Sequence, residues 1–556
     1  MSKMTKAVSD ERISQKIKKE MVDKKAVTNF MGGISYELNP LDTLKILTAS
    51  SIFGEPQYYR DGEFKEKNAT DGVFYVDRLF ANYIIDGLDK YEGKKTSEIM
   101  EEAIDAALDY DFKATLDWAV TLRKDYFMRL NPQVIAVRAA IHPKRQEFTK
   151  ENPSYFAQIN NLIMSRADEP ASQLTYYLYR NKSKKNIPGI LKRSWASKYN
   201  QMSKRDIYKY RNSGMGMIDT IRICHASSDA INELMTTGTV VIEEENKTWE
   251  NLRASGKPWK EILTTINIGH MALLRNLRGI FSEIEDYEFA VELMKKLKAG
   301  VLKGKQFPFR YQSAFKEIEK SNIHHKQLVL DTLEECMDIA CDNLPKLKGK
   351  TMCLSDNSGS AWGNFNSEFG SVTVADIDNL SSVIAAKNSD EGYVGKFGDR
   401  LKVFNVSKRK GVLEQSKAIS EEKYSDVGCS TENGIWIFFR DAIKNKEHFD
   451  NIFIFSDQQA GHGGLYGTPA GIKEYTQLKF DAKGTYVDVA KLISEYRKNV
   501  NPKVNVFSVQ TAGYTNVLVP ENGYRTSILY GWTGKELLYA ETINKFWDEK
   551  DIENNK

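Results

Sequence analysis

The sequence has few cysteines and no long hydrophobic run. Its 556 residues include 5 cysteines, and this odd, sparse count is typical of reduced thiols in a cytoplasmic protein rather than of a disulfide framework. No apolar stretch approaches the about 20 residues of a membrane-spanning helix. The first 25 residues also lack the apolar segment of a secretory signal. We therefore expect a cytoplasmic protein with no membrane partner.

A strong excess of one charge is also missing. The chain carries 79 Lys and Arg against 75 Asp and Glu, a net charge of +4. Any nucleic-acid binding must therefore rest on a local patch rather than on bulk charge. With 41% hydrophobic and 28% charged residues, the chain has the composition of a folded globular protein, and its length predicts about two to four domains.

The common catalytic motifs are absent as well. The chain contains neither a Gly-x-Ser-x-Gly nucleophile elbow nor a Walker phosphate loop. His462-Gly463-Gly464 resembles an esterase oxyanion loop, but it has no nucleophile to serve. A hydrolase or nuclease would need paired carboxylates near a nucleophile, or two metals. We therefore predict that the chain is not an enzyme.

The first part of the chain is predicted to be helical. After an N-terminal arm over residues 1–25, apolar residues recur at helical spacing over 26–347, and breakers such as Asn131-Pro132 separate the segments. A short strand is expected only at Thr239–Glu243. A helical segment of this size favours an α-solenoid over one compact bundle. The expected helices include Thr96–Leu108, Lys113–Leu130, Gln133–Ile141, Pro170–Arg180, Ile218–Thr237 and Lys326–Asn343.

The second part, residues 348–556, alternates strands with helices. Strands that are apolar throughout, joined by helices, indicate a doubly wound parallel α/β domain. The expected strands are Thr351–Ser355, Leu401–Val406, Asn451–Ser456, Val504–Gln510 and Ser527–Trp532. The expected helices are Thr373–Ala386, Thr431–Lys444, Tyr486–Lys498 and Gly534–Phe546.

Oxygen-bearing side chains follow two of these strands. Asp356, Ser358 and Ser360 come after the first strand, and Asp457 follows Asn451–Ser456. Ligands of such sheets bind at the carboxyl ends of the strands, and hard divalent cations prefer oxygen ligands. We therefore predict a magnesium site, with manganese or calcium as alternatives. On the simpler interpretation, Asp356 and Ser358 only cap the helix that follows.

This pattern resembles a von Willebrand factor A domain. In that family an Asp-x-Ser-x-Ser run, a Thr before a middle helix and an Asp after a later strand form the metal-ion-dependent adhesion site. The resemblance implies that an acidic group of a partner completes the coordination, so the site binds rather than catalyses. The implied metal ligands are Asp356, Ser358, Ser360, Thr431 and Asp457, with Ser430 as an alternative to Thr431.

A basic segment lies in the helical part, from Arg180 to Arg211. It contains one acidic residue, Asp206, and four interleaved aromatic residues, which include Trp195. Cations that neutralise phosphates and rings that stack on bases suit single-stranded RNA. The alternative is an ordinary solvated helical surface.

Several motifs in the helical part resemble the TROVE module of the Ro autoantigen family, which joins such a module to a von Willebrand A domain. They occur in family order and include Asn39-Pro40-Leu41-Asp42-Thr43-Leu44, Arg129-Leu130-Asn131-Pro132-Gln133, Arg166-Ala167-Asp168-Glu169, the run Gly214–His225, Ala272-Leu273-Leu274-Arg275-Asn276-Leu277 and Pro308-Phe309-Arg310-Tyr311.

The resemblance implies a ring of HEAT-like helical repeats closed by the α/β domain. It also implies binding of small noncoding RNAs (Y RNAs) outside the ring, capture of single-stranded 3′ ends of misfolded RNA in the central hole, and cooperation with a 3′-exonuclease in RNA quality control. The candidate RNA-binding residues are Arg129, Arg180, Lys182, Lys184, Lys185, Lys192, Arg193, Trp195, Lys198, Lys204, Arg205, Arg211, Arg222 and His225.

Two features qualify these expectations. Where animal members carry a histidine that contacts Y RNA, this chain has Met217, followed by Ile218, so the Y-RNA contact is altered or the cognate RNA differs. Ala272–Leu277 is apolar around Arg275 and Asn276, which predicts a buried polar clamp in the core. The rival function is a protein-interaction scaffold whose working site is the metal.

Overall fold

A computed structural model provides the structure of the chain. It describes residues 26–28, 34–50, 53, 94–181, 185–211, 216–243, 246–306, 308–342, 344–362, 372–429, 432–458, 489–511, 516–519, 523–531 and 536–553.

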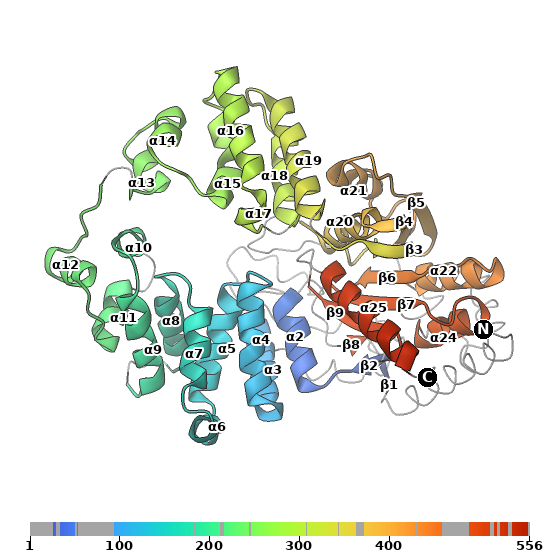
Figure 1. Cartoon of the computed structure of the whole chain (residues 1–556), viewed down its shortest axis with the longest axis horizontal. Coiled ribbons are helices and arrows are strands. Elements are labelled where there is room, and N and C mark those ends of the chain that lie inside the picture. The colour runs from blue at the N-terminus through green and yellow to red at the C-terminus, as the bar shows by residue number, and fades with distance from the viewer. Residues whose placement is uncertain are drawn as a thin grey trace.

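The helices form an arc that leaves one side of a β-sheet and returns to its other side, so that helices and sheet together make a ring (Figure 1). The near arm runs through α2 (Pro40–Ser50), α3 (Thr96–Tyr110), α4 (Phe112–Lys124), α5 (Leu130–Ile141), α6 (Arg145–Glu151), α7 (Tyr155–Ile163), α8 (Glu169–Asn181), α9 (Gly189–Asn200), α10 (Lys204–Tyr210), α11 (Met217–Cys224) and α12 (Asp229–Thr237). The far arm returns through α13 (Trp249–Ala254), α14 (Trp259–Thr265), α15 (His270–Phe281), α16 (Tyr287–Ala299), α17 (Val301–Gly304), α18 (Pro308–Lys320) and α19 (Lys326–Asp342).

Local sequence explains where these helices begin and end. The Asp111 side chain accepts from the Ala114 N–H at the start of α4, which is a standard N-cap. The expected single helix Ile218–Thr237 is in fact α11 and α12, because His225 adopts a left-handed conformation (φ 56°) that ends α11 and Ser228 caps α12. The expected strand at Thr239–Glu243 is wrong, since no strand forms there.

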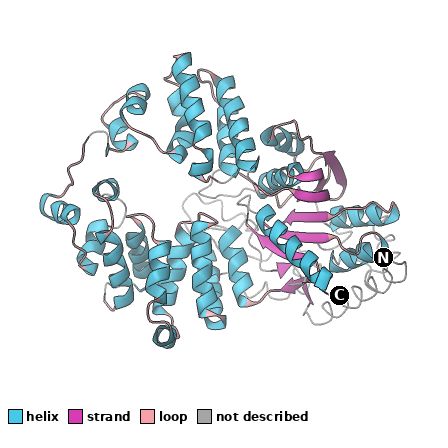
Figure 2. Ribbon diagram, viewed as in Figure 1, coloured by secondary structure: helices cyan, strands magenta, loops and turns pink. Residues whose placement is uncertain are grey.

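The α/β domain is built on a six-stranded sheet (Figure 2). The strand order is β5-β4-β3-β6-β7-β9, parallel except for the antiparallel edge strand β5. The strand β4 is not among those expected from the sequence. The strands are β3 (Leu347–Asp356), β4 (Ser389–Phe397), β5 (Leu401–Asn405), β6 (Asn451–Ser456), β7 (Asn505–Gln510) and β9 (Thr526–Tyr530).

Alternate residues of the central strands enter two different cores, because successive side chains of a strand point to opposite faces. Cys353 and Phe453 pack on the face covered by α20 (Val374–Lys387) and α25 (Glu536–Glu553). Leu354 and Ile454 pack on the other face, against α22 (Glu432–Lys444) and α24 (Val489–Asn499). Because both faces are covered, the strands are apolar throughout, as the sequence analysis inferred.

Two junctions close the ring. At one, Glu334 of α19 accepts hydrogen bonds from the first backbone N–H groups of α21 (Val412–Ser420), those of Leu413 (2.7 Å) and Glu414 (3.0 Å). At the other, Trp118 of α4 packs edge-on against Tyr530 of β9, with ring centroids 5.8 Å apart. The expected fold class, a ring of helical repeats joined to a doubly wound α/β domain, is confirmed.

The start of the described chain joins the α/β side. The strands β1 (Ala26–Thr28) and β2 (Ile34–Glu37) form a small sheet with β8 (Asn516–Val517), in the order β1-β2-β8. This segment was expected to belong to the helical module, and neither β1 nor β2 was predicted. Among the described residues, no helix combines the length and apolarity of a membrane span.

Candidate nucleic-acid cavity and metal site

A cavity of about 1840 Å³ lies inside the ring. Its walls come from both arms of the arc. The near arm contributes the end of α4, the start of α5 and most of α10, and the far arm contributes α13, α15 and α18. The cavity therefore depends on the ring arrangement and on no single helix pair.

The wall of this cavity is strongly basic. Among the described residues, twelve lining side chains are Lys or Arg and four are Asp or Glu, whereas the two kinds nearly balance over the whole chain. Positive charge that is diluted in the sequence is thus concentrated at one place. The basic lining residues are Arg123, Arg129, Arg166, Arg205, Lys209, Arg211, Lys247, Arg275, Arg278, Lys303, Lys305 and Arg310.

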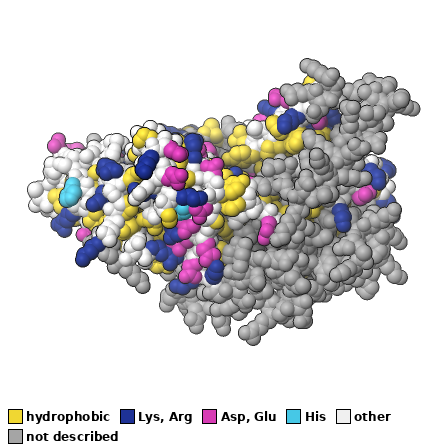
Figure 3. Space-filling view, turned by 90° about the horizontal axis from the view of Figure 1, so that it is seen from below, with side chains coloured by type: hydrophobic (Ala, Val, Ile, Leu, Met, Phe, Trp, Pro, Cys, Tyr) yellow, Lys and Arg dark blue, Asp and Glu magenta, His cyan; other side chains and the backbone are white. Residues whose placement is uncertain are grey.

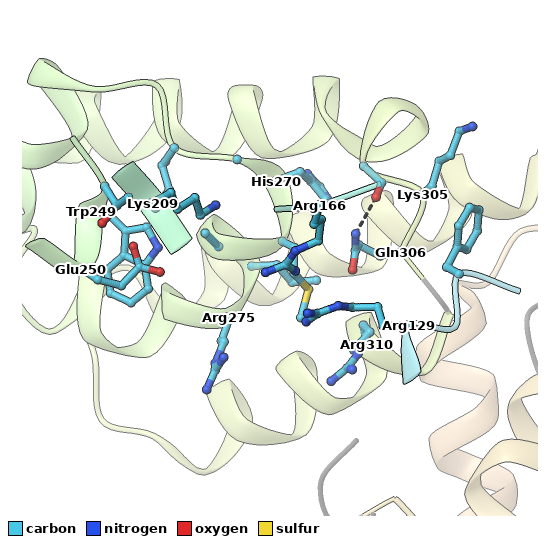
Figure 4. Close-up of a pocket in the computed structure, with 18 of the residues that line it drawn as sticks. Arg129, Arg166, Lys209, Trp249, Glu250, His270, Arg275, Lys305, Gln306 and Arg310 are labelled. Carbon is cyan, nitrogen blue, oxygen red and sulfur yellow. Dashed lines mark hydrogen bonds between the residues drawn. The ribbon is translucent and has the colours of Figure 1, made fainter. Parts of the chain in front are cut away.

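Two groups of these cations differ in the partners of their side chains. Several are held by carboxylates: Arg129 and Arg166 both bind Asp168, at 2.9 and 3.0 Å, and the Arg166 guanidinium lies 4.6 Å from the ring centroid of Tyr210. Figure 4 shows Arg129, Arg166, Arg275 and Arg310 among the side chains that line the cavity.

The second group has neither a carboxylate nor an aromatic ring as a partner among the described residues. Its members are at least partly exposed, so their charges are available to an anionic ligand. They are Arg205, Lys247, Arg275, Lys303 and Lys305.

Aromatic rings stand at the edge of the cavity. Trp249 lines it and is half-buried. Its ring stacks on that of the buried Trp259, with centroids 5.5 Å apart and planes 26° apart, so its orientation is fixed from behind. Tyr210 also lines the cavity and is half-buried. Rigid, partly exposed rings beside cations are the arrangement on which unstacked bases bind.

The outer surface of the helical part differs from the cavity. On the face in Figure 3, Lys and Arg side chains are interspersed with Asp and Glu and do not gather into one patch. Of the predicted RNA-binding residues, Arg129, Arg205 and Arg211 line the cavity. Those described elsewhere are Arg180, Lys185, Lys192, Arg193, Trp195, Lys198, Lys204, Arg222 and His225, while Lys182 and Lys184 lie outside the described residues.

Some of these residues cannot serve as predicted in this conformation. Trp195 is fully buried, and its indole N–H donates to Gln173 at 2.8 Å, so it is a core residue and not a stacking surface. Arg180 is bound to Glu101. Arg222 and His225 are exposed, and Met217, at the altered Y-RNA position, is fully buried.

Most residues that line the cavity are not among those predicted from the sequence to bind RNA. Arg275 is exposed and lines it, so the predicted buried clamp is wrong for this residue. The reason is periodicity: Leu273, Leu274 and Leu277 occupy the buried face of α15 and Arg275 lies off it. A helical-wheel argument places Arg275 on the polar face, but only the closed ring turns that face inward.

The predicted metal ligands that the structure describes converge at the carboxyl edge of the sheet. The Ser358 and Ser360 hydroxyl oxygens are 3.0 Å apart, and the Ser360 hydroxyl lies 3.4 Å from Asp457 Oδ2. Asp356 accepts from the Ser358 N–H at 2.9 Å and from the Ser456 hydroxyl at 2.8 Å. Both aspartates are fully buried. Thr431 and its alternative Ser430 lie outside the described residues.

The buried carboxyl groups of Asp356 and Asp378, at this edge of the sheet, have no positive charge beside them among the described residues. Burial and the nearby Asp457 carboxylate raise the pKa of Asp356 to about 7. Burial and the charges of Asp356 and Asp457 also raise the pKa of Asp378, on α20, well above its usual range. Both Asp378 oxygens are buried, and neither has a hydrogen-bond partner in the described part of the chain.

These residues fit a hard divalent cation. They offer two carboxylates and two hydroxyl groups, the oxygen ligands such ions prefer, and a cation would offset the buried charge. No three acidic, histidine or cysteine side chains converge as a ligand set among the described residues, so direct binding must use the serine hydroxyl groups as well.

Comparison with known proteins adds information on the fold. No family model matches the sequence, and no curated protein sequence matches it significantly. Among solved structures, the chain is similar to the Ro protein (RSR) of Deinococcus radiodurans, with a TM-score of 0.54 at 12% sequence identity. The likeness covers 90% of this chain and 99% of that one. The chain therefore has the fold of a Ro protein over nearly its whole length.

Proposed function

We propose that this chain is an RNA-binding ring protein of the Ro family, and that its cavity binds single-stranded RNA. The observation that carries the proposal is the concentration of twelve basic side chains against four acidic ones on the cavity wall. The fold of a Ro protein and the TROVE-like motifs support the same function. Within that function we propose noncoding RNA of the Y type, single-stranded 3′ ends of misfolded RNA, and a 3′-exonuclease as partners in RNA quality control.

The physical basis of binding is electrostatic. Phosphates of a single strand displace their counterions when they meet the exposed Arg275, Lys303 and Lys305 side chains. Unstacked bases can stack on the ring of Trp249, whose orientation is fixed by Trp259. Contacts of this kind are tolerant of sequence, because every base offers a π-face and every nucleotide a phosphate. Because the bases of a duplex are already stacked on one another, the proposed cavity selects single-stranded over duplex RNA.

A direct test compares two RNA hairpins that differ only in a single-stranded 3′ tail of about 10 nucleotides, within the range such sites contact. Fluorescence anisotropy at low salt should show binding of the tailed hairpin and much weaker binding of the blunt one. A tail moved to the 5′ end tests polarity. Equal binding of the tailed and blunt hairpins would contradict the proposal.

A second proposal concerns the sheet edge: Asp356, Ser358, Ser360, Thr431 and Asp457 hold a divalent cation, with magnesium favoured over manganese and calcium. The uncompensated burial of Asp356 and Asp378 supports it. This cation would supply a positive centre for an oxygen ligand, which the sequence pattern predicts to be an acidic group of a protein partner. Calorimetric titration of the chain and of Asp356→Ala tests it, and equal metal binding by both would refute the assignment.

The scaffold function remains the rival and would need this metal site rather than the cavity. Reversing the charges of Lys184, Lys185, Lys192 and Arg193 separates the two, as does removing the cavity cations. Loss of RNA with protein partners retained favours the RNA function. The five cysteines are all free of disulfides, which supports the proposed cytoplasmic location.

A further inference from the structure

Asp378 is an acidic residue for which the metal-site pattern has no role. It lies on α20, the helix after β3, and is fully buried. Neither carboxylate oxygen meets the distance and angle of a hydrogen bond within the described residues, although the Thr511 hydroxyl, just after β7, lies close enough to favour the charged form. Placing an ionised carboxylate in a protein interior without a partner costs several kcal/mol, so Asp378 needs a compensating positive charge or a proton.

The surroundings of Asp378 show where that compensation lies. The carboxylates of Asp356 and Asp457 are near enough to act on it electrostatically, and the Thr511 hydroxyl faces it. The next residue on α20, Asn379, is tied to the metal-site loop, since it accepts from the Asn357 amide at 2.8 Å. Asp378 is thereby held beside the proposed cation site by a fixed helix.

We propose that Asp378 is a third anionic group of the metal site, supplied by this chain itself, and that it makes the site select a neutral oxygen ligand over an acidic partner. This inference rests on the proposed metal site. It replaces the acidic ligand that the sequence pattern predicts with a water, hydroxyl or carbonyl oxygen.

Charge explains the selectivity. Asp356, Asp457 and Asp378, when ionised, carry three negative charges, and a divalent ion offsets two of them. One negative charge remains in a fully buried setting, where like charges repel far more strongly than in water. An incoming carboxylate would add a further negative charge, whereas a neutral oxygen would not. Since no three acidic side chains form a direct ligand set within the part of the chain that the structure describes, Asp378 acts beside the ligands and not as one of them.

Asp378→Asn tests the inference, because the amide keeps the size of the side chain and removes only its charge. In Mn²⁺ titrations of the full chain the variant should bind about 10- to 100-fold more weakly, the usual effect of losing an outer partner of a metal site. Without metal, the variant should unfold at a higher temperature, because an uncompensated buried carboxyl group is gone. A merely structural role would instead lower the melting temperature. Ser382→Ala, one turn along α20, removes a buried hydroxyl that also lacks a hydrogen-bond partner among the described residues. It is the matched control and should leave the Mn²⁺ affinity unchanged.

Acetate serves as the probe for whether the bound metal accepts a carboxylate ligand. In Mn²⁺-loaded chain, relaxation of the acetate methyl protons should stay at the level of metal-free protein, and in Mn²⁺-loaded Asp378→Asn it should increase. Unchanged Mn²⁺ affinity in the variant, or equal acetate relaxation in both proteins, would overturn the inference. If the unaltered chain binds no Mn²⁺ above the level of Asp356→Ala, the metal site itself fails, and this outcome is distinct from the other two.

Discussion

Removing three cations from the cavity wall should weaken RNA binding in a manner that depends on salt. The variant Arg275→Gln/Lys303→Gln/Lys305→Gln changes exposed side chains that have no carboxylate partner among the described residues, so the fold should survive. The matched control, Lys150→Gln/Lys296→Gln/Lys444→Gln, removes three exposed lysines that lie on α6, α16 and α22 and do not line the cavity.

The size of the effect follows from counterion release. Each phosphate contact to a single strand contributes about −0.7 to the slope of log Kobs against log salt. The five cavity cations with neither a carboxylate nor a ring partner therefore predict a slope of about −3.5, and loss of three should reduce it to about −1.4. The same relation predicts a loss of affinity of roughly 500-fold near 50 mM salt that shrinks to roughly 30-fold near 200 mM.

The assay is anisotropy of a labelled RNA hairpin with a single-stranded 3′ tail, measured over that salt range. The control variant should keep both the affinity and the slope of the unaltered chain to within a small factor. An equal fold-loss at all salt concentrations would mean that the three side chains act through structure and not through charge. An unchanged affinity would refute the assignment of the cavity.

Three further predictions follow from single contacts. Trp249→Ala should weaken binding of the RNA tail by about 1–3 kcal/mol with little change in melting temperature, whereas Trp195→Ala should lower the unfolding free energy by about 3–5 kcal/mol, as measured by urea denaturation. Glu334→Ala should cost about 0.5–2 kcal/mol of stability, because two N–H groups at the start of α21 lose their cap. The pKa of Asp356 is raised to about 7. In metal-free protein, its contribution to the free energy of unfolding should therefore be greatest below about pH 4 and should be lost as the pH rises through about 7. Mn²⁺ affinity should rise over the same interval, and melting curves with and without chelator check both trends.

The sequence predicts most of the fold because its patterns are local. Helices such as α3 and the buried strand β6 follow from apolar spacing within their own residues. The strand β4 was missed because its run, Ser389–Phe397, contains polar residues and is buried by partners on β3 and β5. The strand β2 was missed because one of its partners, β8, lies more than 470 residues along the chain, and β1 pairs only with β2 among the described strands.

The proposed metal site and the cavity also differ in how far local sequence patterns predict them. In the proposed metal site, Asp356, Ser358, Ser360 and Asp457 follow strand ends, and parallel strands bring their ends to one edge, so spacing alone predicts that these residues lie close together. Arg275, Lys303 and Lys305 come together across the ring with Arg205 from the opposite arm, and no local pattern records that meeting. Trp195 shows the converse: it sits within a basic run, but its helical face points into the core.

Crosslinking of a photoreactive base at the 3′ end of a tailed RNA hairpin, with mass spectrometry of the attached peptides, tests the central claim most directly. The predicted result is attachment to segments that line the cavity, around Trp249, Tyr210 and the turn at Lys303–Lys305. Attachment confined to the outer helices or to the α/β domain would contradict the account.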